Sequence, residues 1–109
     1  MAESVRQLLA KKSGTVDDGA TDVIDSIPLA RFSRLEYSVS LRDTTSDKSK
    51  GFKFKVQNVE TNVSDTLTNK FGDPINIEIS ANVNGSDCEI SLKNNELFDL
   101  NWTWTRLKL

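Results

Sequence analysis

Hydrophobic and polar side chains alternate with a period of two along most of the chain after residue 30. The clearest runs cover residues 35–41, 52–56, 75–83 and 88–92. A period of two is typical of a β-strand that buries one face and exposes the other. The side chains predicted to face inward are Leu35, Tyr37, Val39, Leu41, Phe52, Phe54, Val56, Ile75, Ile77, Ile79, Ala81, Val83, Cys88, Ile90 and Leu92.

Short polar segments separate these runs and predict turns. Residues 43–51 are polar throughout, and the Asn84-Gly85 pair predicts a two-residue hairpin because both positions tolerate a positive φ. Residues 63–71 are less regular, and no helical period lies between the runs. Together these features predict an all-β body over residues 31–109. We expect a small antiparallel β-sandwich, or a small barrel, of about six to eight strands.

The first 30 residues have a different pattern. Val5, Leu8 and Leu9 have the i, i+3, i+4 spacing of one short helix. Such a small apolar stripe does not stabilise an isolated helix in water, so the helix needs a surface to lie on. Residues 13–27 are acidic and rich in turn formers, which predicts an extended or loosely ordered connector.

These features predict two parts, an N-terminal docking arm over residues 1–30 and a β-sandwich domain over residues 31–109. An arm that buries little on its own body is stabilised mainly by binding a partner. Its removal is therefore expected to leave a folded domain that no longer assembles. The predicted partner-binding residues are Val5, Leu8, Leu9, Val23, Ile24 and Ile27.

The alternation changes phase near the end of the chain. Trp102 and Trp104 are in phase with Leu100, whereas Leu107 and Leu109 are in the opposite phase. A β-bulge near residue 105, which would return both leucines to the core, or fraying of the last residues is the favoured interpretation. Alternatively, they face outward onto a neighbouring subunit, and Leu107 and Leu109 then join Lys53 and Lys55 as a predicted outward interface.

Composition narrows the function classes. The 109 residues include no histidine, the commonest general base and metal ligand, and only one cysteine. The net charge of −2 does not suit a sequence-independent nucleic-acid binder. No run of 18 apolar residues is present, so no transmembrane helix is expected, and the N-terminus does not read as a secretion signal. We expect no enzyme activity, no cofactor, no nucleic-acid partner and no membrane partner.

Two clusters of charged residues have alternative interpretations. Asp17, Asp18, Asp22 and Asp25 invite a calcium site, but the spacing of an EF-hand loop is missing and a solvated acidic linker is favoured. The lysines near residues 48–55 alternate with Phe52 and Phe54. The phenylalanines therefore belong to the core and the lysines to the solvent face, where an anionic patch on a partner protein would suit them.

Three other features each have a functional and a structural interpretation. Trp102 and Trp104 could stack on sugar rings, although core positions are favoured in a chain with so few aromatic residues. Cys88 is in phase with Ile90 and Leu92 and reads as a small buried apolar residue. The three glycosylation-type triplets carry no weight without a secretion signal.

The body also resembles a group of known proteins. The segments that carry the resemblance are Arg31-Phe-Ser-Arg-Leu-Glu-Tyr-Ser-Val-Ser-Leu-Arg-Asp43, Gly51-Phe-Lys-Phe-Lys-Val-Gln-Asn58, Ile75-Asn-Ile-Glu-Ile-Ser-Ala81 and the stretch to Trp104-Thr-Arg106. In strand order and spacing they resemble small β-sandwich structural proteins of tailed-bacteriophage virions, of the head-decoration, neck or collar, or tail-fibre class. Residues 61–71 match nothing in that pattern.

The resemblance implies a non-enzymatic virion subunit that is made in the host cytoplasm. It would dock through its arm onto neighbouring capsid, neck or tail proteins. It would also assemble in symmetric copies, with a trimer as one form. The competing class is a surface binding module that recognises carbohydrate or a host receptor through Trp102, Trp104 and the polar turns.

Overall fold

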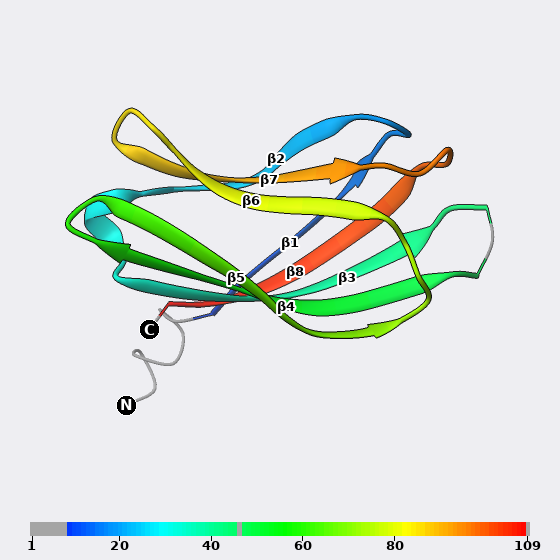
Figure 1. Cartoon of the computed structure of the whole chain (residues 1–109), viewed down its shortest axis with the longest axis horizontal. Helices are drawn as coiled ribbons and strands as arrows, with labels where there is room; N and C mark the ends of the chain where they lie inside the picture. The colour runs from blue at the N-terminus through cyan, green and yellow to red at the C-terminus, as the bar shows by residue number, and fades with distance from the viewer. Residues whose placement is uncertain (1–8, 46, 109) are drawn as a thin grey trace.

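The computed structural model describes residues 9–45 and 47–108, and these form a two-layered β-sandwich (Figure 1). Its strands are β1 (Leu9–Val16), β2 (Thr21–Pro28), β3 (Arg34–Asp43), β4 (Ser49–Val59), β5 (Asn62–Gly72), β6 (Ile77–Asn84), β7 (Asp87–Asn94) and β8 (Leu100–Lys108). A short 3-10 helix, η1 (Leu29–Arg31), links β2 to β3. Within the described residues, no helix is long and apolar enough to span a membrane.

The strands form two antiparallel sheets that pack face to face. One sheet has five strands in the order β1-β8-β3-β4-β5, and the other has three in the order β2-β7-β6. Figure 1 shows the three-stranded sheet above the five-stranded one. Strands from the beginning of the chain pair with strands near its end, since β1 pairs with β8 and β2 pairs with β7.

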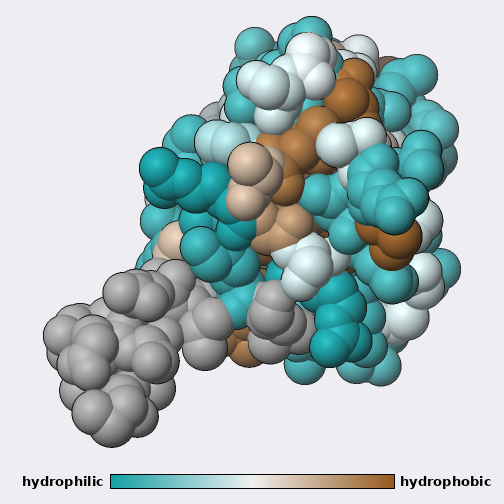
Figure 2. Space-filling model, turned by 90° about the vertical axis from the view of Figure 1, so that its left-hand side faces the viewer, coloured by the Kyte–Doolittle hydropathy of each residue, from teal (hydrophilic) through white to brown (hydrophobic). Residues whose placement is uncertain are grey.

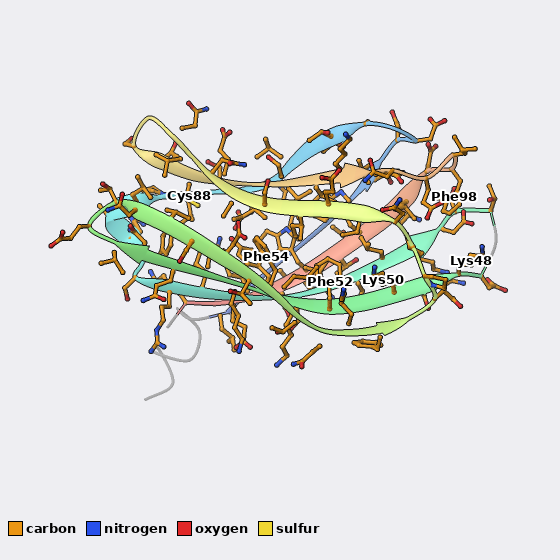
Figure 3. All side chains as sticks on the ribbon, viewed as in Figure 1. Lys48, Lys50, Phe52, Phe54, Cys88 and Phe98 are labelled. Atoms are coloured by element: carbon orange, nitrogen blue, oxygen red, sulfur yellow. The ribbon has the colours of Figure 1, made fainter. Side chains whose placement is uncertain are left out.

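The alternating runs form strands as predicted, and their apolar side chains meet between the sheets. Burial is nearly complete for the inward residues of β3, β4, β7 and β8, and Figure 3 shows Phe52 and Phe54 in the space between the sheets. The buried apolar core is Val16, Ile24, Ile27, Leu29, Phe32, Leu35, Tyr37, Val39, Leu41, Phe52, Phe54, Val56, Ile75, Cys88, Ile90, Leu92, Leu100, Trp102 and Trp104. The predicted all-β sandwich is confirmed. On β6 the inward residues are only partly buried, and Val83 is 48% exposed.

The first strands overturn the predicted connector. Residues 9–16 pair with β8 in the five-stranded sheet, and residues 21–28 pair with β7 in the three-stranded sheet. Ile24 and Ile27 are buried in the core, so they are not available for docking. The predicted helix is wrong from residue 9 onward. A helix this short is not stable by itself in water, whereas pairing with β8 gives these residues regular backbone hydrogen bonds and covers the edge of β8. The remaining part of the predicted helix, with Val5 and Leu8, lies outside the described residues.

A bulge explains why the alternation of β2 was not recognised. The register between β2 and β7 shifts between Val23 and Asp25, where Ile24 is the extra residue. A bulge places consecutive side chains on the same face of a strand. As a result, both Ile24 and Asp25 are buried, although they are neighbours in the sequence.

Three predictions about local backbone geometry are resolved. The β6–β7 hairpin is confirmed, but its two turn residues are Gly85 and Ser86, and only Gly85 has a positive φ, of 63°. The bulge predicted near residue 105 is wrong, since β8 pairs without a register shift from end to end with both of its neighbours. The irregular segment 63–71 lies in β5, whose pairing with β4 shifts register opposite Gly51–Lys53.

Candidate interaction face

The outer face of the five-stranded sheet carries a one-sided distribution of charge. Because side chains alternate across a strand, the residues opposite the core residues of β1, β3, β4, β5 and β8 share this outer face. Its cations are Lys11, Arg34, Arg42, Lys53 and Lys55. Among the described residues, Glu36 is the one carboxylate that these strands place there. We call this surface the basic face.

Most of the positive charge on the basic face is not neutralised internally. Lys53 Nζ lies 3.5 Å from Glu36 Oε1, and Arg42 Nη2 lies 3.1 Å from Asp47 Oδ1 in the following loop. In the described part of the chain, Lys11, Arg34 and Lys55 form no ion pair. The face can therefore attract an anionic surface, and this attraction would be sensitive to salt.

A shallow groove of about 330 Å³ crosses the basic face over β3, β4 and β5. Arg34 and Lys55 line it together with Gln57 and the hydroxyls of Ser64, Thr66 and Thr68. The Thr68 hydroxyl is buried and has no hydrogen-bond partner in the described structure. The groove thus offers hydroxyl and amide groups beside two cations.

Small side chains make the rest of the basic face nearly flat. Ser and Thr residues occupy most of its uncharged positions, and Gly51 lies under the ring of Phe71. A Cβ built on Gly51 would clash with the ring of Phe71, so the glycine allows the ring to lie close to the sheet. Phe71 is 69% exposed and provides an apolar contact at the β5 edge.

The structure brings together three of the four residues predicted as an outward interface. Lys53, Lys55 and Leu107 all belong to the basic face, and Leu107 is 40% exposed. Leu109 lies outside the described residues. Of the predicted docking residues, Leu9 begins β1 opposite Leu107.

The docking strip predicted along residues 23–27 is not present on the surface. Val23 is 51% exposed on the outer side of β2, whereas Ile24 and Ile27 point into the core. The strip is therefore reduced to one exposed valine. The reason is the β2 bulge, which turns Ile24 inward.

The two tryptophans occupy core positions, which the sequence favoured. Trp102 is 6% exposed and Trp104 is 3% exposed. Trp104 Nε1 donates a hydrogen bond of 2.9 Å to the Ile24 carbonyl, and its ring stands edge-on to that of Tyr37 at 5.4 Å. Neither ring can present a flat face to a sugar, so the carbohydrate platform formed by these residues is wrong.

A buried polar cluster was not recognised in the sequence. Asp25 Oδ2 accepts a hydrogen bond of 2.6 Å from Tyr37 Oη and one of 2.7 Å from Arg106 Nη1. The Ser26 backbone N–H donates to Asp25 Oδ1 at 2.9 Å. Asp25 comes from the three-stranded sheet and its two side-chain partners from the five-stranded sheet. The cluster therefore ties the layers together, and only the β2 bulge made Asp25 available for it.

Burial governs the ionisation of the two most reactive side chains in the core. Burial raises the pKa of the Tyr37 hydroxyl, and the neighbouring Asp25 carboxylate raises it further. Burial likewise raises the pKa of the Cys88 thiol above its usual range. Both groups are thus held in their neutral forms, which suits packing and hydrogen bonding rather than nucleophilic attack.

The aspartates near the first turn do not gather into a metal site. Asp17 and Asp18 lie exposed in the β1–β2 turn, and Asp25 is directed into the core. Among residues 9–45 and 47–108, no group of three or more His, Cys, Asp or Glu side chains could hold a metal ion.

One end of the sandwich has an apolar surface. Figure 2 shows a strip of hydrophobic side chains between polar surroundings at the end where η1 and the β6–β7 turn lie. An open groove of about 400 Å³ there is lined by Leu29, Ala30 and Val83 with small turn residues. At the opposite end, Lys48 lies in the loop between β3 and β4 (Figure 3).

Comparison with known proteins identifies the fold. No family model and no curated protein match the chain. The tailspike protein of Acinetobacter baumannii phage AM24 is similar over 98% of this chain and 27% of that one, with a TM-score of 0.53 and 11% identity. A tailspike protein of Acinetobacter baumannii bacteriophage Fri1, described as a capsular polysaccharide depolymerase, is similar over 93% of this chain and 18% of that one. Its TM-score is 0.53 and its identity 13%. The chain thus shares its β-fold with one part of each tailspike.

Proposed function

We propose that this chain is a non-enzymatic structural module of a phage tail, present in several copies within the virion. The observation that carries the proposal is the fold, since the sandwich corresponds over 98% of its length to part of a phage tailspike. The tail is preferred to the head or neck because the two similar structures described above are both tailspike proteins. In this role the sandwich provides a rigid body with two broad outer faces.

The absence of enzyme activity is part of the proposal. It is supported by how the reactive side chains are used: Cys88 is a buried thiol, and Tyr37 and Asp25 are bound to each other inside the core. The Fri1 tailspike is described as a depolymerase, but the part of it that this chain resembles makes up only 18% of its length. The activity of that longer protein need not reside in the shared part, because function depends on a site and not on a fold.

Docking is proposed for residues 1–8, which include Val5 and Leu8, whereas Leu9, the third residue of this predicted group, is the first residue of β1. This segment is what remains ahead of the sandwich once residues 9–28 of the predicted arm are assigned to β1, β2 and the turn between them. A variant that lacks residues 1–8 retains all eight strands and tests this assignment. It should fold as the full chain does, by circular dichroism and melting temperature, and fail to enter particles.

The location in the virion is tested on purified phage particles from cells that carry the gene. An antibody against the sandwich should label the tail in immunogold electron microscopy, and the chain should sediment with the particles in several copies. Recovery of the chain only in the soluble lysate, or labelling of the head alone, would refute the proposed location.

A further inference from the structure

The outer face of the three-stranded sheet has the charge opposite to that of the basic face. Glu78 on β6 and Asp87 and Glu89 on β7 lie on this side, because their neighbours in sequence face the core. Among the described residues of these strands, Lys93 is the one cation on this side, and its Nζ lies 3.8 Å from Glu78 Oε2. We call Glu78, Asp87 and Glu89 the acidic strip. The net charge of −2 thus conceals two outer faces of opposite sign.

We infer that copies of this chain associate head to tail, with the basic face of one copy against the acidic strip of the next. The inference rests on the proposed function as a module present in several copies. Opposite charges favour this contact, whereas two basic faces or two acidic strips would repel one another. A two-fold symmetric contact through either face is therefore disfavoured.

The dimensions of the faces suit a contact of moderate strength. The molecule is 40 Å long, and five strands at a spacing of about 4.8 Å make a face about 20 Å wide. Such a face approaches the roughly 800 Å² per partner of a standard protein interface. The narrower three-stranded side limits the shared area, so we expect association that depends on concentration and weakens with salt.

Apolar side chains on both faces add contact area that does not depend on charge. Phe71 and Leu107 are exposed on the basic face, and Val23 is exposed on the outer side of β2. The acidic strip lies on β6 and β7, beside the free edge of its sheet. A head-to-tail contact of this kind either closes into a ring or continues as an open stack.

Two charge-reversal variants test the inference on the purified full chain. Lys53→Glu with Lys55→Glu makes the basic face acidic, and Glu78→Lys with Glu89→Lys makes the acidic strip basic. Sedimentation velocity should show wild-type association at about 50 mM salt that weakens strongly at about 500 mM. Each double variant alone should associate at least about tenfold more weakly than the wild type.

Mixing the two double variants is the decisive step. The unaltered acidic strip of the first variant and the unaltered basic face of the second reconstitute the wild-type contact, so a mixed complex should form. Lys48→Glu with Lys70→Glu has the same net charge as the first variant but changes exposed lysines outside the basic face, and it should associate as the wild type does. Lys53→Gln with Lys55→Gln gives a neutral version should the reversed pair fail to fold.

The inference is overturned if the wild type stays monomeric at low salt, if high salt leaves its association unchanged, or if the mixture forms no complex. It is also overturned if the Lys48 and Lys70 control loses association as the first variant does. Labelling of virions is measured on particles and does not depend on these results. A monomeric chain found on the phage tail would refute the head-to-tail contact while leaving the proposed function in place.

Discussion

Asp25, Tyr37 and Arg106 place a polar cluster between sheets that are otherwise held together by apolar side chains. Asp25 is 9% exposed and Tyr37 is fully buried, whereas the Arg106 side chain is 20% exposed. A buried charge is tolerated only when it is paired and hydrogen-bonded. Asp25 meets this condition through two side-chain donors and one backbone donor.

Replacement of Asp25 by alanine should therefore destabilise the protein by about 2–4 kcal/mol, because it leaves the Arg106 guanidinium without its partner. Urea unfolding followed by tryptophan fluorescence measures the loss. Asp47→Ala is the matched control, since it removes a carboxylate paired with an arginine at a fully exposed site. It should change stability little. Equal losses in both variants would contradict the role of the buried cluster.

The raised pKa of Tyr37 should lower the free energy of unfolding at high pH. Its folded-state pKa is raised, so the unfolded chain loses this proton at a lower pH than the folded chain does. The stabilisation is complete below the tyrosine's ordinary pKa of about 10 and falls by about 1.4 kcal/mol per pH unit above it.

The free energy of unfolding, measured by urea titration between pH 8 and pH 11, tests this. Tyr37 is the only tyrosine, so Tyr37→Phe removes its contribution and should reduce the decline above pH 10. Burial also raises the pKa of the Cys88 thiol, and any pH dependence from this residue is present in both proteins. Identical pH profiles for the wild type and the variant would contradict the prediction.

At the scale of elements, β1 and β2 belong to the sandwich and complete both sheets. β1 covers one edge of β8, and β2 covers one edge of β7 while contributing Ile24 and Ile27 to the core. Asn94, at the end of β7, is completely buried, and its side-chain amide donates to the carbonyls of Val16, Asp17 and Phe98. It joins the β1–β2 turn to the connection before β8.

Truncation distinguishes the sandwich from the segment that precedes it. Removal of residues 1–30 deletes two strands and the Asp25 carboxylate, so the remainder should not fold, contrary to the expectation drawn from the sequence. Removal of residues 1–8 should leave the melting temperature within a few degrees of the full chain. Circular dichroism and thermal melting measure both variants. A stable, cooperatively folding 31–109 fragment would contradict the structural role of β1 and β2.

At the scale of the whole molecule, one core extends from Val16 to Trp104 and joins both ends of the chain. The β1–β8 pairs, such as Gly14 with Trp102, connect residues nearly the full chain length apart. The protein should therefore unfold as one cooperative unit. Because such long-range pairs close large loops, folding should take milliseconds to seconds rather than microseconds.

Coincident transitions test this cooperativity. Both tryptophans lie in β8 and report on the core, while far-UV circular dichroism reports on all strands. The two signals should give the same urea midpoint, and the tryptophan emission should shift to longer wavelength only in that transition. An earlier circular-dichroism transition that leaves the tryptophans buried would indicate that the first strands unfold separately.

The strands that the sequence predicted best are those with strict alternation and large apolar residues. In β3, Leu35, Tyr37, Val39 and Leu41 are all buried, as their period of two required. The outward position of Lys53 and Lys55 followed from the same period. What sequence reasoning missed in β2 has a local cause, because a bulge interrupts its alternation between Val23 and Asp25. β1 was missed because Ala10, Lys12, Gly14 and Val16 make too weak an apolar face to indicate a strand.

The sequence by itself determined the all-β class, most of the inward-facing residues and the placement of the tryptophans in the core. These follow from a period of two and from the burial of large apolar side chains, which are local properties of the chain. Only the tertiary structure decided that residues 9–28 complete the sheets, that Asp25 binds Tyr37 and Arg106, and that charges scattered in sequence sort into a basic face and an acidic strip. Each of these depends on which strands become neighbours, and strand pairing between distant segments is fixed by the packing of the whole sandwich.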